Sequence, residues 1–235
     1  MFTIYPAASR FVADHGWLNS SFSFSFAEYY DPANMNFGPM RVLNDDYVKA
    51  GYGFGTHPHK EMEIVSIVLD GALSHKDSTG NEETLFPGEI QRMSAGTGIL
   101  HSEYNGSLDG TTNFLQLWFE PATYGLAPSY EQFAYEQEAM VNVLLPVVSS
   151  KKQEHRVATI NQDMTIYLSK LQEGKKLQFT QEVGRRIFLF VIEGSLTLDG
   201  DKKLERRDSA RITDLPELSI EANKDSYFML IDLPY

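Results

Sequence analysis

The chain has 235 residues, a formal net charge of −12 at pH 7 and no cysteine. Without cysteine, disulfides, thiolate metal ligands and cysteine nucleophiles are excluded. The acidic balance argues against direct binding to nucleic acid or to an anionic membrane, because both require a basic face. The sequence shows no secretory signal, and no apolar run approaches the roughly 20 residues of a membrane span. We therefore expect a cytoplasmic protein.

Short predicted strands dominate the first half. Phe22, Phe24 and Phe26 alternate with serines, which predicts a half-buried strand. Further strands are predicted by apolar runs bounded by turn residues, at 40–43, 64–69, 72–76, 90–94 and 114–119. We interpret Asn44-Asp45-Asp46 as a turn. Strands of about five to seven residues with Gly and Pro between them indicate an all-β barrel or sandwich.

The second half repeats this pattern. After a linker-like stretch at 121–128, the segment Ile187–Leu196 matches Ile64–Leu73 in kind, including an acidic residue followed by glycine. A weak internal duplication predicts two β-domains of similar plan, which we place at residues 1–125 and 126–235.

Histidines and carboxylates at strand spacing indicate a metal site in the first half. His57 and His59 lie two residues apart, so in a strand both side chains point to one face. His101 and Glu103 form a second such pair, after a glycine-rich turn. Three imidazoles and one carboxylate complete the ligand shell of a first-row divalent metal. Glu63 has suitable parity too, and the spacing alone leaves the choice between Glu63 and Glu103 open.

The remaining candidates receive plainer interpretations. We interpret His15 and His75 as structural or surface histidines, and Phe54 and Trp118 as core residues. In the second half, Thr180-Gln181-Glu182 aligns with the first histidine pair, so we expect no metal site there.

Two stretches of this sequence resemble the cupin motifs. Residues 51–63 follow the first motif in the spacing of glycine, histidines and glutamate, and residues 88–105 approximate the second. Ser94 in place of a proline and two extra residues before His101 are departures that fit the pirin branch of the cupins. The segments SFSFAEYYDP, FGPMRVLNDD, GFGTHPHKEMEIV and IQRMSAGTGILHSEYN are similar to that family, especially to its shorter bacterial members.

The resemblance implies a bicupin fold of two jelly-roll β-barrel domains, with metal in the N-terminal one only. It implies His57, His59, His101 and Glu103 as metal ligands, with Glu63 behind a histidine. One divalent transition metal is expected, with iron as the first choice and manganese, nickel, cobalt or copper compatible with the same ligands. Four protein ligands leave two positions of an octahedral ion open, as a dioxygenase requires. Glu103 would then also serve as general base.

The resemblance also implies an activity, because several pirins are similar to flavonol dioxygenases that cleave quercetin with O₂ and release carbon monoxide. We therefore expect a flavonol-like aromatic hydroxy-ketone and O₂ as substrates of a monomeric enzyme. Two alternatives stay open: a metal-dependent, redox-sensing interaction protein, and another cupin enzyme. An exposed apolar patch away from the metal would favour the former, and substrate profiling would identify the latter.

Overall fold

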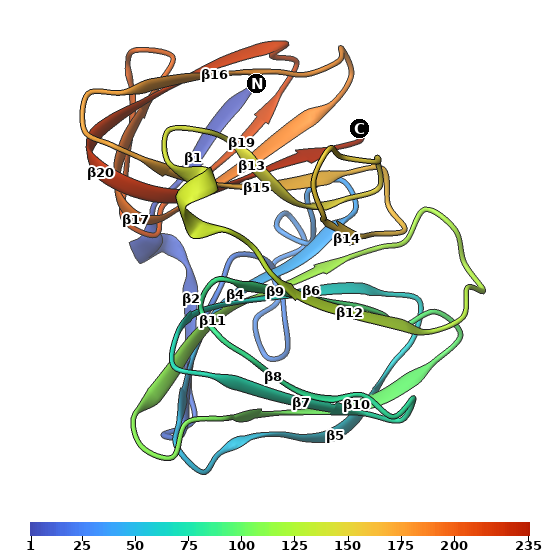
Figure 1. Ribbon diagram of the computed structural model, residues 1–235. Coiled ribbons are helices and arrows are strands. Elements are labelled where there is room, and N and C mark those ends of the chain that lie inside the picture. The colour runs from blue at the N-terminus through green and yellow to red at the C-terminus, as the bar shows by residue number, and fades with distance from the viewer. The chain divides into compact units, whose positions relative to one another are not determined.

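The structure is a computed structural model that describes residues 1–235 and is built almost entirely of β-strands (Figure 1). The chain folds as two compact units. The N-terminal unit comprises Phe11–Tyr135 and Ala158–Gln162, and the C-terminal unit comprises Met1–Arg10, Glu136–Val157 and Asp163–Tyr235. None of the helices has the length and hydropathy needed to cross a membrane. The prediction of an all-β protein is confirmed.

Two antiparallel sheets build the N-terminal unit, in the orders β12-β9-β6-β11-β4-β3-β2 and β5-β10-β7-β8. Figure 1 shows these sheets facing each other as a jelly roll that is not a closed barrel. The strands of these sheets are β2 (Phe11–Asp14), β3 (Leu18–Phe22), β4 (Met40–Lys49), β5 (Gly53–His59), β6 (Glu63–Asp70), β7 (Leu73–Asp77), β8 (Glu82–Leu85), β9 (Glu89–Ser94), β10 (Ile99–Asn105), β11 (Thr111–Phe119) and β12 (Ser129–Ala134). The short strand β14 (Ala158–Thr159) also lies in this unit but in neither of its two sheets.

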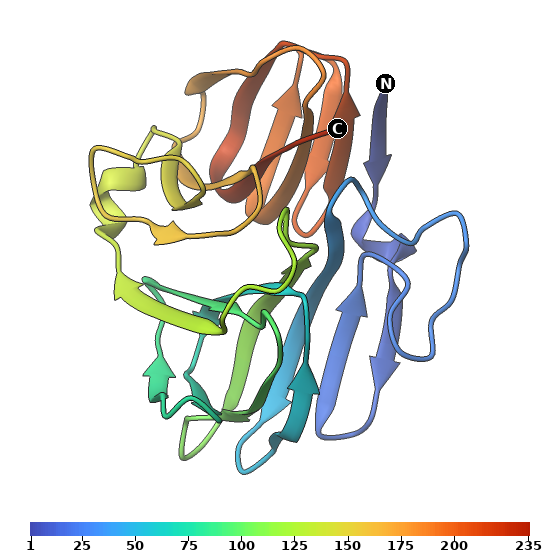
Figure 2. The same cartoon turned by 90° about the vertical axis from the view of Figure 1, so that its right-hand side faces the viewer.

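The C-terminal unit has one large sheet in the order β1-β19-β17-β20-β15-β13, with β16 paired to β20 and β18 to β17. Its first strand comes from the start of the chain and lies beside strands from the end of the chain (Figure 2). The elements are β1 (Phe2–Tyr5), η1 (Ala7–Ser9), η2 (Gln137–Met140), β13 (Leu145–Ser149), β15 (Thr165–Leu171), β16 (Lys176–Thr180), β17 (Arg186–Leu198), β18 (Lys202–Glu205), β19 (Ser209–Thr213) and β20 (Glu217–Leu233).

The two units share one topology. The order β9-β6-β11-β4 in the first corresponds to β19-β17-β20-β15 in the second, and β5-β10-β7-β8 corresponds to β16-β20-β17-β18. The long strands β17 and β20 take part in both halves of this pattern, whereas the N-terminal unit divides the same path among β6, β7, β10 and β11. The predicted jelly-roll plan, repeated in both units, is therefore confirmed.

A glycine occupies the same point of the path in both units. Gly71 has φ +79° where the chain passes from β6 to β7, and a Cβ there would lie 2.6 Å from the Thr112 hydroxyl. Gly194 has φ +95° at an irregularity of β17, where a Cβ would collide with Ser226 on β20. Both positions require glycine, because the backbone is left-handed and the neighbouring strand leaves no room.

The interiors of the two units differ in chemistry. The C-terminal unit is filled by an apolar cluster that includes Phe179, Leu196, Leu218 and Ile220, contributed by the strands that correspond to β5, β7 and β10. In the N-terminal unit those three strands instead carry histidines and carboxylates. Both groups of side chains that could hold a metal ion lie in this unit.

Two sequence-based interpretations are wrong. The predicted strand through Phe26 ends at Phe22, because Ser25 bonds with Asp31 and Phe26 pairs with Tyr29 in a local turn. The supposed turn at Asn44-Asp45-Asp46 lies inside β4 and is buried. Specific partners offset the cost of burying these polar side chains: Ser20 bonds to the Asp46 carboxylate, and Asn113 donates to Asp45 Oδ1 at 2.9 Å.

The close approach at Gly194 generates a prediction about stability. A Gly194→Ala substitution should lower the free energy of unfolding by about 3 kcal/mol, because left-handed strain adds to a collision with Ser226. Gly200→Ala is the matched control, since Gly200 has φ +78° but open space around its Cβ position, and about 1 kcal/mol is expected. Urea denaturation measures both values. Equal losses in the two variants would show that crowding by β20 contributes nothing.

Candidate metal centre

Pairing between β5 and β10 brings the three predicted histidines together. His57 and His59 point to one face of β5, and the register places His101 opposite His57. The ring centroids lie 4.5 Å apart for His57 and His101 and 4.8 Å apart for the two other pairs. The three imidazoles therefore form a nearly equilateral triangle.

The ring nitrogens fit a divalent cation. Nε2 of His57 lies 3.0 Å from Nε2 of His101. With metal–nitrogen bonds of about 2.1 Å, neighbouring ligands of an octahedral ion are about 3.0 Å apart and those of a tetrahedral ion about 3.4 Å. His57 Nδ1 lies 2.7 Å from the Gly55 carbonyl oxygen, a hydrogen bond that leaves the Nε2 lone pair free. His59 Nε2 is buried and has no hydrogen-bond partner, which a metal ion would remedy.

Burial keeps His59 and His101 in the form that binds metal. It lowers the pKa of His59 to about 4, with a further contribution from His57. The pKa of His101 also lies well below its ordinary value because of burial and the neighbouring imidazoles. Neutral imidazole is the ligand form, so His59 and His101 stay ready to bind well below neutral pH.

Glu103 adds a buried carboxylate to the site. It follows His101 on β10 and is 3% exposed. Burial raises its pKa to about 7, although three hydrogen bonds partly oppose the shift. The donors are Ser66 Oγ at 3.4 Å, Gln91 Nε2 at 3.4 Å and Gln116 Nε2 at 2.7 Å. A carboxyl group with this pKa can lose or accept a proton near neutral pH.

The other carboxylates near the histidines in sequence have different partners. Glu63 is buried and accepts hydrogen bonds from Ser94 Oγ at 2.8 Å and from the Asn161 backbone N–H at 3.1 Å. Glu61 accepts from the Gly125 backbone N–H. Neither belongs to a group of potential ligands, whereas Glu103 does.

Sequence reasoning missed His75. Its side chain is 2% exposed and lies behind His101, with 3.5 Å between the two Nδ1 atoms. Its Nε2 lies 3.1 Å from Asp77 Oδ2. The β7–β10 register pairs His75 with Glu103 and Asp77 with His101, so the period of two would have revealed both residues had that strand pairing been predicted.

A cavity of about 480 Å³ lies against the imidazoles, and every residue that lines it belongs to the N-terminal unit. Trp118 packs its edge against His59 at 4.7 Å and lines the cavity together with Phe54, so the interpretation of both as core residues is incomplete. The other lining residues are His15, Trp17, Leu18, Ser20, Phe22, Phe26, Ala27, Glu28, Asn44, Asp46, His57, Glu103 and Gln116.

Polar residues interrupt this largely apolar lining. Asn44 Oδ1 and Trp118 Nε1 are buried and have no hydrogen-bond partner. Burial raises the pKa of Asp46 to about 7; the bond from Ser20 lowers it, and the nearby Asp45 and Glu103 raise it further. Asn44, Asp46 and Trp118 thus place an acceptor, a neutralisable acid and a donor among the residues that line the cavity.

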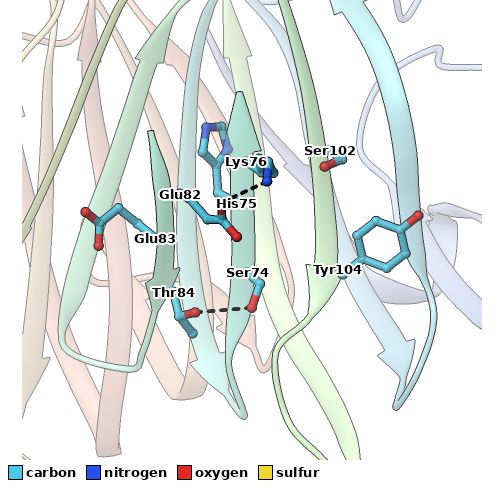
Figure 3. Close-up of a pocket in the computed structure, with 8 residues that line it drawn as sticks. All are labelled: Ser74, His75, Lys76, Glu82, Glu83, Thr84, Ser102 and Tyr104. Atoms are coloured by element: carbon cyan, nitrogen blue, oxygen red, sulfur yellow. Dashed lines mark hydrogen bonds and ion pairs between the residues drawn. The ribbon is translucent and has the colours of Figure 1, made fainter. Parts of the chain in front are cut away.

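A second hollow, of about 540 Å³, lies on the outer side of the β5-β10-β7-β8 sheet (Figure 3). Its lining includes an exposed ion pair between Lys76 and Glu82 at 2.8 Å and a hydrogen bond between Ser74 and Thr84 at 3.2 Å. His75 also borders it, but its imidazole is buried on the opposite face of β7 from Lys76. This hollow holds no cluster of potential ligands.

Comparison with known families gives two matches. The family described as Pirin matches residues 6–119, and that described as Quercetinase C-terminal cupin domain matches residues 147–233. A protein named quercetin 2,3-dioxygenase from Escherichia coli K12 is 41% identical over 234 residues, covering 100% of this chain and 99% of the relative. A pirin-like protein from Caulobacter vibrioides is 37% identical and covers 94% of each chain.

Solved structures of bacterial relatives are similar to this chain over its whole length. The crystal structure of YhhW from E. coli has a TM-score of 0.95 and 41% sequence identity, covering 100% of this chain and 98% of the other. The bacterial pirin YhhW has also been crystallised in complex with nickel(II), and that structure has a TM-score of 0.94 at 40% identity, covering 100% of this chain and 99% of the other. Together with the imidazole triangle, the nickel complex supports a divalent metal in this protein.

The raised pKa of Glu103 predicts that metal binding releases a proton. If Glu103 is a ligand, it must ionise on binding, and near pH 6 a group with a pKa of about 7 is mostly protonated. Nickel binding at pH 6 should therefore release close to one proton more in the wild type than in Glu103→Gln, and the difference should vanish at pH 8.5. Calorimetric titration in buffers of different ionisation enthalpy measures the number of protons released per nickel ion bound.

Linkage gives the direction of the pH dependence. Because the metal competes with the proton on Glu103, metal affinity should fall as the pH drops through 7. His59 and His101 add nothing to the difference, because their lowered pKa values leave both rings neutral at pH 6 in either protein. Equal proton release from the wild type and Glu103→Gln at pH 6 would contradict the role of Glu103.

Proposed function

Because the chain belongs to the pirin family of cupin proteins, we propose that it is a metal-dependent dioxygenase that cleaves flavonols such as quercetin with O₂ and releases carbon monoxide. One observation carries the proposal: an aromatic cavity of about 480 Å³ is bounded by imidazoles and a buried carboxyl group. That volume suits one small molecule, since ligand cavities typically measure about 300 to 1,000 Å³.

We propose His57, His59, His101 and Glu103 as the ligands. The triangle of rings, the unpartnered His59 Nε2 and the position of Glu103 support this choice. Iron is our first candidate, and nickel, manganese, cobalt and copper suit the same donors. The bound ion would supply Lewis-acid and redox chemistry at a substrate oxygen. Glu63, held by Ser94 and Asn161, would have a supporting role only.

The chain's own residues would bind and orient the flavonol. Trp118 and Phe26 pack edge to face at 5.3 Å, and both line the cavity, where flat rings can stack against them. Asn44 Oδ1 and Trp118 Nε1, both buried without partners, would bond with substrate hydroxyl groups. Such pairing favours hydroxylated rings over plain hydrocarbons of the same size.

Glu103 would remove the proton from the flavonol 3-hydroxyl group. As a metal ligand Glu103 would be ionised, because the metal displaces the proton that its carboxyl group holds in the metal-free site, and a carboxylate can accept the substrate proton. The Gln116 amide donates to Glu103 Oε2 at 2.7 Å and thereby fixes the direction of the carboxylate. A buried, oriented base of this kind is the arrangement that proton abstraction requires.

The cavity also bears on the two alternatives. An interaction protein requires an exposed partner surface, whereas here a concave, largely apolar cavity lies beside His57 and His59. This favours a small-molecule substrate. A cupin enzyme with another aromatic hydroxy-ketone as substrate would use the same groups, and substrate profiling separates it from a quercetinase.

The proposed activity can be tested directly. Protein reconstituted with iron, manganese, nickel, cobalt or copper should consume O₂ with quercetin and release an equal amount of carbon monoxide. His57→Ala should abolish the reaction, and Glu103→Gln should slow it at least about 100-fold, because the general base is lost. Oxygen-electrode and carbon monoxide measurements give both rates.

Glu61→Gln is the matched control, because Glu61 bonds only to the Gly125 backbone, and its rate should equal that of the wild type. Free metal in buffer measures background autoxidation of quercetin. If no metal raises the rate above that background, the oxygenase proposal is wrong and the sensing protein becomes the better hypothesis.

The choice between the two buried carboxylates has its own test. Glu103→Gln should lower nickel occupancy more than Glu63→Gln, since of the two carboxylates only Glu103 shares a group of potential ligands with His101. Metal analysis after dialysis measures the nickel occupancy of each variant, and circular dichroism checks that both variants fold. The reverse order would assign the carboxylate ligand to Glu63.

A further inference from the structure

We propose that Asp77 and His75 form a buried hydrogen-bond relay that positions His101 and sets which of its nitrogens faces the metal. The inference rests on the proposed metal site and adds two positioning residues to it. Neither belongs to the four ligands proposed above, and both are buried.

Strand pairing brings the relay together. In the β10–β7 register, Asp77 lies opposite His101, and His75 lies opposite Glu103. Along β7, the residues Leu73, His75 and Asp77 are buried, whereas Ser74 and Lys76 face the outer hollow (Figure 3). The two relay side chains therefore point into the N-terminal unit, toward His101.

A chain of close contacts runs from the imidazole triangle through His101 and His75 to the Asp77 carboxylate. Nε2 of His101 lies 3.0 Å from Nε2 of His57, on the side of the imidazole triangle. The other nitrogen of His101, Nδ1, lies 3.5 Å from His75 Nδ1. His75 Nε2 in turn lies 3.1 Å from Asp77 Oδ2. His101 thus contacts the triangle through Nε2 and His75 through Nδ1, and His75 contacts His101 through Nδ1 and Asp77 through Nε2.

A single arrangement of protons satisfies this line. Asp77 can only accept, so His75 carries its proton on Nε2 and donates it to the carboxylate. His75 Nδ1 is then an acceptor and receives the N–H of His101 Nδ1. This leaves the lone pair on His101 Nε2, where the proposed ligand set needs it. A carboxylate behind a ligating histidine also makes that histidine a stronger donor to metal.

Asp77 is anchored for this role. Its Oδ1 accepts from the Thr79 hydroxyl at 2.7 Å and the Thr79 N–H at 2.8 Å, and its Oδ2 accepts from Asn81 Nδ2 at 2.9 Å. The ring of Tyr130 stacks on His75 with centroids 4.7 Å apart and planes 25° apart. The carboxylate and the plane of His75 are therefore both fixed from outside the site.

The same atoms allow one competing explanation. Ligand atoms of His75, His101 and Glu103 lie within 4.8 Å of one another, so they could hold a second ion. That ion would require His101 to bind through Nδ1 while Nε2 serves the first ion, which demands loss of both ring protons. The relay needs no such deprotonation, and metal stoichiometry distinguishes the two.

The test measures metal binding, so it does not depend on oxygenase activity. His75→Phe keeps a ring against Tyr130 but removes both nitrogens. We expect one nickel per chain in both proteins, an affinity loss of about 10- to 100-fold in His75→Phe, and an altered visible spectrum with cobalt. His75→Gln, which restores an acceptor for His101, should recover part of the affinity. His155→Phe is the matched control, because His155 is exposed in the C-terminal unit, and it should bind like the wild type.

Three other results of the binding measurements would overturn the relay. Unchanged affinity and spectrum in a folded His75→Phe protein would remove the relay. Two metals per wild-type chain, falling to one in the variant, would replace the relay by a second metal site. If His75→Phe fails to fold, His75→Gln and Asp77→Asn give the same comparison, and wild-type affinity in both would refute the relay. A wild-type protein that binds no metal would refute the proposed ligands as well, whereas metal binding without quercetin turnover would refute the proposed function alone.

Discussion

The antiparallel register between β5 and β10 is the constraint on which the site depends. It sets His101 opposite His57, and β10 also pairs with β7, so the same strand positions His75 and Asp77. Because side chains alternate along a strand, a slip of one residue in β10 would turn both His101 and Glu103 to the outer face. The proposed ligands, the cavity wall and the proposed relay therefore all depend on the two backbone ladders that β10 forms, with β5 and with β7.

This arrangement gives the N-terminal unit an interior that opposes its own stability. Asp46 and Glu103 are buried with raised pKa values, and His59 keeps an unpartnered nitrogen. The C-terminal unit fills the equivalent space with side chains such as Phe179 and Leu218. Two copies of one topology thus have different interiors, one suited to packing and one to chemistry. A ligand that binds only the folded state would stabilise the N-terminal unit.

The sequence predicts the parts of this picture that depend on local pattern. Alternating residues and turn signals predict the all-β fold, and the two-residue spacing places His57 and His59 on one face of a strand, and His101 and Glu103 on one face of another. The predictions that fail concern residues whose partners lie far away in the sequence. Asp45 and Asp46 resemble a turn until Asn113 and Ser20 are known to satisfy them. His75 resembles a surface residue until β7 is paired with β10. The pairing of β1 with β19 joins segments about 200 residues apart, beyond any local signal.

That last pairing has a consequence for biosynthesis. Phe2–Tyr5 leaves the ribosome long before its partner strand, Ser209–Thr213, is synthesised. Residues 11–135 and 158–162 can assemble while synthesis continues, whereas the opening strand must wait with its backbone groups unpaired. During that wait it resembles an exposed edge strand, the kind of segment that pairs with the wrong neighbour. Until Ser209–Thr213 is available, Phe2–Tyr5 is therefore a point at which the nascent chain can misassemble.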